Sequence, residues 1–288
     1  MPSWAAAPTA TTSAASSITP TSVALNGSGT PNGEAATGWF RISSTNPVTC
    51  DDVFGTRVPS FSGTGLGSGV AAMSFSITTT GLTSGITYYY CTVVSNASGK
   101  AFGTMQSFTV PGAPVVTTTT ATAITSTAAT LGGSATPTGA STTGSFRYST
   151  VDPGACNASF GTVTIGTSLG SGFAPATYTR GVTGLAPATT YYYCAIGTNI
   201  HGTSFGAVQS FTTLPVAPVV TTGTVTVLGS TSAQLNATAN PGGGTTTVWF
   251  RYTTTGITNC NDSIGTRVPS SGGTDIGSGF SNVAVTET

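Results

Sequence analysis

The stretch GLAPATTYYYC, from Gly184 to Cys194, has a second copy in the chain, GLTSGITYYYC, from Gly81 to Cys91. Gly, Pro, Ser and Thr at the start of each copy favour a turn, and the tyrosines that follow favour a β-strand. Side chains alternate between the two faces of a strand, so Tyr191 and Tyr193 share one face. We therefore expect a strand with two tyrosines in a core, and with one tyrosine and the cysteine on its outer face.

The rest of the chain repeats with the same period. GWFRIS, SFRYS and WFRYTT align on three phenylalanines that are spaced 106 and 104 residues apart, at Phe40, Phe146 and Phe250. MQSFTVPGAPVVTT at Met105 likewise matches VQSFTTLPVAPVVTT at Val208. A period of this length is the size of a domain and exceeds that of a solenoid repeat. We predict three units, at residues 1–111, 112–215 and 216–288.

Within each unit, short β-like runs alternate with clusters of turn residues, and no segment has a sustained helical periodicity. In the second unit we expect strands at Val115–Thr120, Ala128–Gly133, Gly144–Ser149, Thr190–Gly197 and Ala207–Thr213, with two further strands between Gly161 and Val182. This spacing is typical of an antiparallel β-sandwich. The predicted fold class is all-β, with tandem sandwiches joined by short proline-containing linkers.

The third unit is expected to be incomplete. GTDIGSGFSNVAVTET aligns with GTGLGSGVAAMSFSIT, which places Thr288 opposite Thr78. The counterpart of TYYYC and of the strand after it is therefore missing, so one sheet edge and half of a core are left open. Two explanations are open: a longer array that continues the chain, which we favour because arrays commonly extend, or strands supplied by another chain. PSWAAAP, from Pro2 to Pro8, faintly resembles the end of the last strand and fits either explanation.

Five cysteines occupy two places in the repeat. Cys50, Cys156 and Cys260 follow the third strand of their units, whereas Cys91 and Cys194 end the tyrosine runs. The economical pairing is one disulfide per complete unit, Cys50–Cys91 and Cys156–Cys194, and leaves Cys260 without a partner in the chain. Closing a loop of ~40 residues would stabilise each unit by about 4 kcal/mol in the chain-entropy model. Regular disulfides predict an oxidising compartment, which is the cell exterior, the cell surface or the periplasm. We expect the protein to be extracellular or at the cell surface.

At this point the second unit shows a resemblance to a known family. GLAPATTYYYCAIGTNIHGTSFGAVQSFTT resembles the end of a fibronectin type III domain, in which a Leu-x-Pro-x-Thr-x-Tyr corner leads into strand F. The matching positions are Leu185, Pro187, Thr189 and Tyr191. The first unit keeps Leu82 and Tyr88 but has Ser84 in place of the proline, and the third unit matches in part.

The resemblance implies a fold and a location. It implies an immunoglobulin-like sandwich in which Tyr88 and Tyr191 are corner tyrosines, with hydroxyls bonded to nearby backbone. The tyrosine- and threonine-rich version is similar to tandem modules of large secreted bacterial proteins. The resemblance implies no reaction, because this fold hosts many roles.

An exposed binding surface is the sharper alternative for the outer face of the tyrosine strand. Tyr89 and Tyr192 are the two tyrosines of these runs that could stack on sugars. Arginines recur after each aligned phenylalanine, at Arg41, Arg147 and Arg251, and we expect them to lie over the sheet near those tyrosines. Glycans are thus considered as partners, beside other copies of the chain or adjoining domains.

Charge and titratable residues argue against several functions. Only 5% of residues are charged, against about 25% in an average soluble protein, and seven basic side chains balance seven acidic ones. This argues against nucleic-acid binding, and no apolar run is long enough for membrane insertion. His201 is the one histidine, in a turn, so we expect no enzyme. Without CxxC spacing we expect no metal site and no cofactor, and carboxylates such as Asp51, Asp52 and Asp262 are too few for calcium. We expect these acids in polar loops, paired with Arg57 or Arg267.

The favoured function is structural: a disulfide-bonded repeat array that forms a surface fibre, stalk or filament subunit. The alternative is an adhesin, or a carbohydrate-binding spacer module of a secreted protein or hydrolase. A secreted enzyme whose catalytic domain lies elsewhere in a longer protein is a further alternative.

Overall fold

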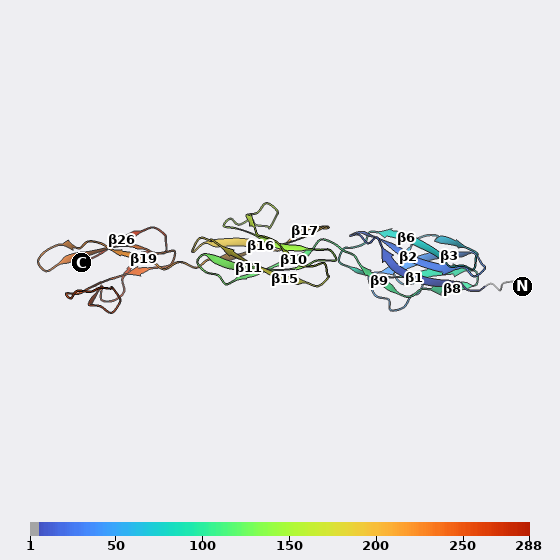
Figure 1. Cartoon of the computed structure of the whole chain (residues 1–288), viewed down its shortest axis with the longest axis horizontal. Helices are drawn as coiled ribbons and strands as arrows, with labels where there is room; N and C mark the ends of the chain where they lie inside the picture. Colours follow the sequence, from blue (N-terminus) through green and yellow to red (C-terminus); the bar gives the residue numbers. More distant parts are fainter. Residues whose placement is uncertain (1–5) are drawn as a thin grey trace.

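The computed structural model describes residues 6–288, and these residues form strands without any helix. The prediction of an all-β fold is confirmed. Figure 1 shows three units in a row, with the N-terminus at one end of the row. Residues 1–5 lie outside the described residues, and with them most of PSWAAAP, the segment that resembles the end of the last strand.

Unit 1 consists of two facing antiparallel sheets. The first has the order β1 (Thr9–Ser16), β2 (Ser22–Thr30), β6 (Met73–Thr80). The second is centred on the pair β3 (Ala36–Ser43) and β7 (Thr87–Asn96). The outer edge of β3 pairs with β4 (Thr56–Val58) and β5 (Thr64–Gly67), and that of β7 pairs with β8 (Gly99–Phe102) and β9 (Gln106–Thr109).

Unit 2 repeats this topology. Its first sheet has the order β10 (Val115–Thr122), β11 (Ala128–Thr136), β15 (Ala176–Thr183). Its second sheet is built on β12 (Thr143–Ser149) and β16 (Thr190–Asn199), with β13 (Thr162–Val163), β14 (Thr167–Ser168), β17 (Gly202–Phe205) and β18 (Gln209–Thr212) at its edges.

The strand predicted at Ala207–Thr213 is confirmed as β18, and the sequence did not predict the short strand β17 that precedes it. The two strands are separated at Gly206, where the chain passes close to β10. A Cβ there would lie 2.6 Å from the backbone nitrogen of Thr118, so only glycine fits.

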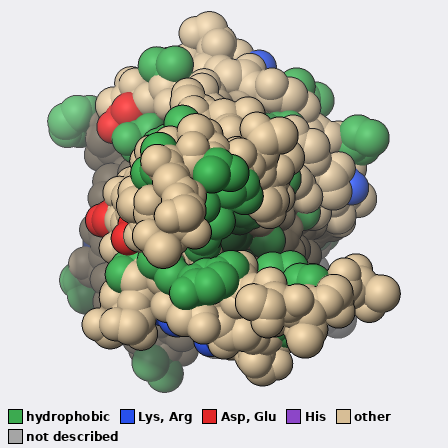
Figure 2. Space-filling model, turned by 90° about the vertical axis from the view of Figure 1, so that its left-hand side faces the viewer, with side chains coloured by type: hydrophobic (Ala, Val, Ile, Leu, Met, Phe, Trp, Pro, Cys, Tyr) green, Lys and Arg blue, Asp and Glu red, His purple; other side chains and the backbone are tan. Residues whose placement is uncertain are grey.

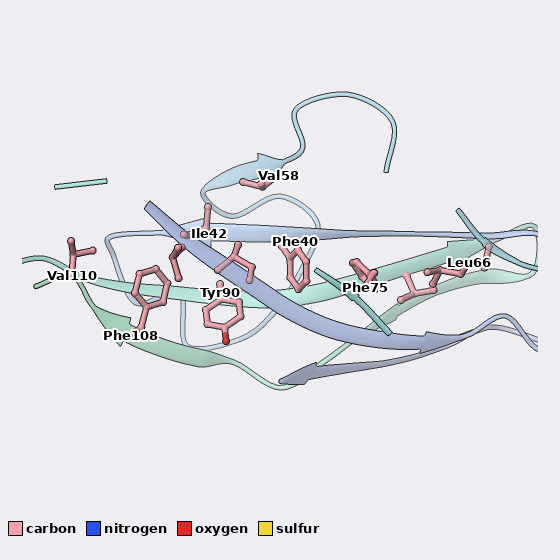
Figure 3. Packing of buried hydrophobic residues seen from close by; sticks show 12 residues of the cluster. Phe40, Ile42, Val58, Leu66, Phe75, Tyr90, Phe108 and Val110 are labelled. Carbon is pink, nitrogen blue, oxygen red and sulfur yellow. The ribbon is translucent and has the colours of Figure 1, made fainter. Parts of the chain in front are cut away.

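The core of each complete unit lies between its sheets and is rich in aromatic rings. In unit 1, Phe40 and Tyr90 are fully buried, and the ring of Phe40 lies 5.0 Å from that of Phe75 (Figure 3). In unit 2 the equivalent rings are Phe146, Tyr193 and Tyr178. Burying such rings is the main stabilising contribution in a chain with so few charges.

Unit 3 has the first sheet but only half of the second. Its first sheet contains β19 (Val219–Thr222), β20 (Thr226–Val227), β21 (Ala233–Asn240) and β26 (Val283–Glu287). Opposite lie two short pairs, β22 (Thr247–Val248) with β25 (Thr274–Asp275), and β23 (Phe250–Tyr252) with β24 (Thr266–Val268). In the described chain, nothing pairs with the edge of β23 that corresponds to the β7 edge of β3.

The boundaries at 111/112 and 215/216 fall within the linkers between β9 and β10 and between β18 and β19. Backbone bonds tie each linker to the unit after it. The amide of Gly112 donates to the carbonyl of Thr138 at 3.0 Å, and that of Val216 donates to the carbonyl of Gly242 at 2.9 Å. Both joints are therefore built in the same way.

Candidate functional site

The tyrosine strands β7 and β16 are the centres of their units. Tyr90 and Tyr193 are completely buried. The hydroxyl of Tyr90 donates to the carbonyl of Ser13 at 2.5 Å, and Tyr193 donates to the carbonyl of Thr119, each on the opposite sheet. Burial raises the pKa of both side chains to about 12. These tyrosines therefore join the two sheets of each sandwich.

Tyr88 and Tyr191 begin the same strands at the corner. The hydroxyl of Tyr88 accepts a hydrogen bond from the amide of Thr83 at 3.1 Å, and that of Tyr191 accepts one from Ala186 at 3.0 Å. Both rings also stack on a core phenylalanine, Phe108 of β9 in unit 1 and Phe211 of β18 in unit 2. Each corner tyrosine thus fixes the turn that leads into its strand.

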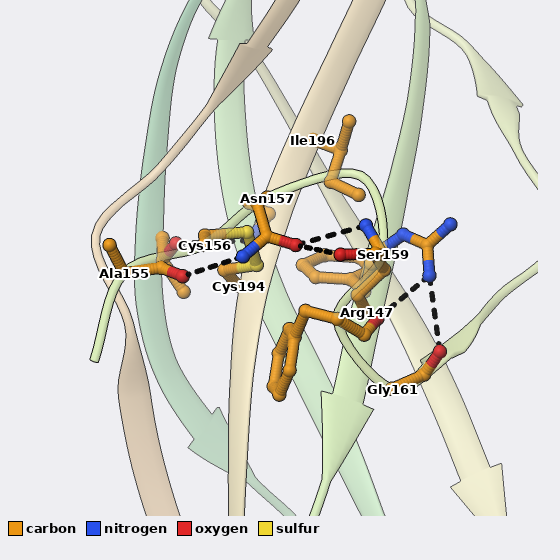
Figure 4. The surroundings of a disulfide bond; sticks show 12 residues. Arg147, Ala155, Cys156, Asn157, Ser159, Gly161, Cys194 and Ile196 are labelled. Carbon is orange, nitrogen blue, oxygen red and sulfur yellow. Dashed lines mark hydrogen bonds between the residues drawn. A yellow bond between two sulfur atoms is a disulfide. The ribbon is translucent and has the colours of Figure 1, made fainter. Parts of the chain in front are cut away.

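The cysteines join the same strands to the loops after β3 and β12. Disulfides link Cys50 to Cys91 and Cys156 to Cys194 (Figure 4), with Cα atoms 6.1 and 6.2 Å apart. Cys91 and Cys194 lie on the outer face of the strand, as alternation requires, yet both are fully buried. The loop covers this face, which the sequence had suggested would be open. Cys260 of unit 3 is exposed and has a free thiol.

Arg147 on this face holds the loop, so its guanidinium is not free to bind a ligand. One guanidinium nitrogen of Arg147 donates to the carbonyls of Phe160 and Gly161, at 2.7 and 3.1 Å (Figure 4). Arg41 is only 9% exposed. The prediction of an exposed surface that includes Arg41 is therefore wrong, because the loop after the third strand folds back over it.

The two outer tyrosines, Tyr89 and Tyr192, are half-buried. Tyr89 lines a shallow hollow of about 380 Å³ together with Asn46, Val48, Met105, Gln106 and Ser107. Tyr89 and Tyr192 therefore do not form an open aromatic platform, and a small hollow lies beside Tyr89.

A tryptophan cluster on β3 was not anticipated from the sequence. The indole nitrogen of Trp39 donates to Asp52 at 3.0 Å, and the guanidinium of Arg57 lies 4.5 Å from the ring centre. Lys100 from β8 forms an ion pair with Asp52 at 2.5 Å, so the expected partner Arg57 is replaced by Lys100. Burial opposes ionisation of Asp52, but the bonds from Lys100 and Trp39 outweigh it and lower its pKa. The cluster fastens the loop to the sheet.

Unit 3 has the same cluster without the lysine. Trp249 donates to Asp262 at 3.0 Å, and Arg267 lies 4.7 Å from the ring centre. Asp262 pairs with Arg251 at 2.9 Å, not with Arg267 as expected. Hydrogen bonds from Arg251 and Trp249 lower the pKa of this carboxyl. Recurrence of Trp and Asp at the same places in units 1 and 3 was the signal that could have revealed the cluster.

The asparagines that end β7 and β16 hold the linkers. The amide nitrogen of Asn199 donates to the carbonyls of Gly112 and Pro137, at 2.8 and 3.0 Å. Asn96 makes the same two bonds, to Ala6 and Pro31, at 2.8 and 2.9 Å. Each complete unit therefore clamps the segment that enters it.

Groups suited to catalysis or metal binding are dispersed. Within residues 6–288, no three His, Cys, Asp or Glu side chains gather where they could hold a metal ion. The backbone amide of His201 donates to Asn199 in the turn, and Asp51 accepts two backbone amides in its own loop. Residues 6–288 contain no helix that is long and apolar enough to span a membrane.

Comparison with known proteins gives structural likeness alone. No model of a known protein family matches the sequence, and no curated protein does either. The chain is similar to the FN1–FN3 domains of chicken CNTN1, with 14% identity, 96% of this chain and 88% of that chain covered, and a TM-score of 0.39.

Two further similar structures are forms of the sensor domain of the anti-sigma factor RsgI4 of Pseudobacteroides cellulosolvens. The shorter form shares 23% identity over 35% of this chain and 94% of its own, with a TM-score of 0.27. The longer form shares 21% over 40% and 99%, with a TM-score of 0.26. Because these TM-scores are below 0.5, the assignment of the fold rests on the strand order and register described above. The two disulfides fit an extracellular protein.

Proposed function

We propose that the chain is a load-bearing segment of an extracellular array, which serves as a stalk, surface fibre or filament subunit. The observation that carries the proposal is the shared construction of the two complete units, together with a backbone hydrogen bond that recurs at both joints. Each complete unit has a disulfide between its third-strand loop and its central strand, and each has an asparagine clamp on the entering linker. Repetition of joints supports a structural role, since each unit then meets its neighbour in one orientation.

Force applied along the chain would first break the hydrogen bonds between strands, and the disulfides would then carry the load. In unit 1 the bond between Cys50 and Cys91 spans 41 residues, and in unit 2 that between Cys156 and Cys194 spans 38. A sandwich that unfolds under load therefore cannot release these residues. Each unfolding event would therefore lengthen the array by less than the full contour length of one unit, which suits a fibre exposed to shear.

Single-molecule pulling of the full chain tests this proposal. Reduction should lengthen the extension per unfolding event by about 140 Å for unit 1 and about 130 Å for unit 2, at 3.3–3.6 Å per extended residue. The matched control is Cys50→Ser with Cys91→Ser, in which reduction should lengthen only the event of unit 2. Low-force unfolding of both oxidised units, at forces typical of an unbonded linker, would contradict a load-bearing role.

A binding module is the second candidate, and the hollow beside Tyr89 is the observation that favours it. Its tyrosine ring and the amides of Asn46 and Gln106 are side chains that contact sugars in stacking sites. Binding of a glycan array by the chain, lost in Tyr89→Ala and kept in Tyr192→Ala, would support this candidate. Retention of binding in Tyr89→Ala would exclude the hollow.

A further inference from the structure

The open face of unit 3 corresponds to faces that are covered in units 1 and 2. A cavity of about 710 Å³ lies there, lined by Leu235, Tyr252 and Val268 among others. Figure 2 looks onto this end and shows hydrophobic side chains gathered in a hollow between two layers. Tyr252 is 50% exposed, whereas its counterpart in unit 1, Ile42, is 7% exposed and lies opposite Tyr90 of the neighbouring strand β7. In units 1 and 2 this face is covered by a hairpin, which consists of the central strand, β7 or β16, and the strands that follow it.

Residues that face each other across the sandwich indicate which side chain fits one position after the cysteine of this hairpin. In units 1 and 2, glycines of β2 and β11 face Thr92 and Ala195. A Cβ on Gly133 would come within 2.7 Å of the Cβ of Ala195, closer than two such atoms approach. Unit 3 has Ala237 at this position. Because Ala237 has a Cβ, only glycine fits opposite it on the facing strand, at the position directly after the cysteine.

A second facing pair specifies the position three residues after the cysteine. Gly197 of β16 has no space for a Cβ, which would lie 2.8 Å from Val116 and 3.1 Å from Pro114. Unit 3 carries Val220 and Pro218 in the same places. Glycine is therefore required here too, although unit 1, with Ala10 in place of the valine, accommodates Val94.

The tryptophan cluster specifies a basic residue nine positions after the cysteine. Lys100 occupies that position in unit 1, where Trp39 is 6% exposed. Unit 2 has Thr203 there and Ser145 in place of the tryptophan. Unit 3 has Trp249, which is 39% exposed, beside the carboxylate of Asp262. A lysine or arginine would cover the ring and pair with the carboxylate, as in unit 1.

From these observations we infer that the open face of unit 3 binds a β-hairpin of another segment of the array, with its cysteine bonded to Cys260. The hairpin has Tyr-x-Tyr-Cys, glycine one and three positions after the cysteine, and asparagine five positions after it to hold the linker carbonyls. A basic residue follows nine positions after the cysteine. This inference rests on the proposed array, yet it is tested at unit 3, whereas the pulling experiment reads units 1 and 2.

The full chain, oxidised in a glutathione buffer with synthetic hairpins, tests the inference. Hairpin one copies residues 81–110, hairpin two copies residues 184–213, and hairpin three is hairpin two with Ala195→Gly and Thr203→Lys. The fraction of Cys260 bonded to each hairpin, measured by peptide mapping, should rise from one to two to three. We expect about tenfold more bonding for the third hairpin than for the first, which corresponds to about 1.4 kcal/mol, because the third hairpin removes the steric overlap in the core.

The control is hairpin three with the cysteine and the preceding tyrosine exchanged, which turns the sulfur toward the core. Bonding of this control to the same extent, equal bonding of all hairpins, or no bonding of any would overturn the inference. Preferred pairing of Cys260 with Cys260 of a second copy would also overturn it. As a second measurement, hairpins one and three fused after Thr288 should differ in the protection of Trp249 from oxidation, with hairpin three protecting more.

Discussion

Single residues in the tyrosine strands determine how the sheets meet. Tyr90 and Tyr193 place a hydroxyl within an apolar core and satisfy it with one carbonyl of the opposite sheet. A buried hydroxyl without such a partner would cost about 1–3 kcal/mol. The neutral tyrosine is therefore the form that the folded units stabilise.

Alkaline titration should weaken both complete units. The pKa of Tyr90 and Tyr193 is raised to about 12, against about 10 in unfolded chains. This stabilisation is complete below pH ~10 and is lost as pH rises through 12. The free energy of unfolding, from urea titrations followed by circular dichroism, should decline in that interval. In Tyr90→Phe with Tyr193→Phe the decline should be smaller, with about 1 kcal/mol lost per unit at neutral pH. An unchanged decline would contradict this origin.

A residue could be placed from the sequence where the local periodicity of its strand determines its position. The alternation in TYYYC located core and corner tyrosines, since strand periodicity is local. The burial of Cys91 and the engagement of Arg147 could not be found in this way, because both depend on the path of the loop after the third strand. Trp39 and Asp52 meet through the same loop. The loop is irregular, so no periodicity reveals what it covers.

At the scale of elements, strands of the two sheets pack so closely that glycine is required on one side. Gly133 on β11 lies opposite Ala195 on β16, and Gly27 lies opposite Thr92 in unit 1. Such close approach of sheets brings the aromatic rings on either side into contact. The strands themselves were predictable within a few residues, as β10, β11 and β16 show. The separate strand β17 was not predicted, since the break at Gly206 that sets it apart from β18 reflects contact with β10.

Exchanging the members of a facing pair should reveal this complementarity. Gly133→Ala should destabilise unit 2 by about 1–3 kcal/mol through overlap with Ala195. Adding Ala195→Gly should recover a large part of that loss, which a double-mutant cycle in urea would measure. The single variant Ala195→Gly serves as the control for the cost of glycine in a strand. Additive losses would show that the two residues do not compete for space.

At the scale of the whole molecule, the units stand in a row with short linkers between them (Figure 1). Proline restricts the residues of each linker, and the bonds from Asn199 and Thr138 restrict the linker between units 1 and 2 further. The molecule should therefore behave as a stiff rod in which bending occurs at joints.

Removing one clamp should make the rod bend. In Asn199→Ala, the carbonyls of Gly112 and Pro137 lose their shared donor, and the joint between units 1 and 2 should sample more angles. Small-angle scattering should then report a shorter maximum dimension, with the melting of the units little changed. The control Asn157→Ala removes an exposed loop amide and should leave the dimension as it was. An unchanged dimension in both variants would show that proline alone stiffens the joint.

The order of the cysteines along the chain has a consequence for biogenesis. Each disulfide joins neighbours in sequence, Cys50 with Cys91 and Cys156 with Cys194. A chain that emerges from its amino end presents the second thiol of a pair before the first thiol of the next unit. Pairing in order of appearance then yields the native bonds, so an oxidant should suffice and an isomerase should be dispensable. Pulse-labelled secretion without an isomerase should yield correctly bonded chains, whereas scrambled bonds between units would show that pairing follows release of the whole chain.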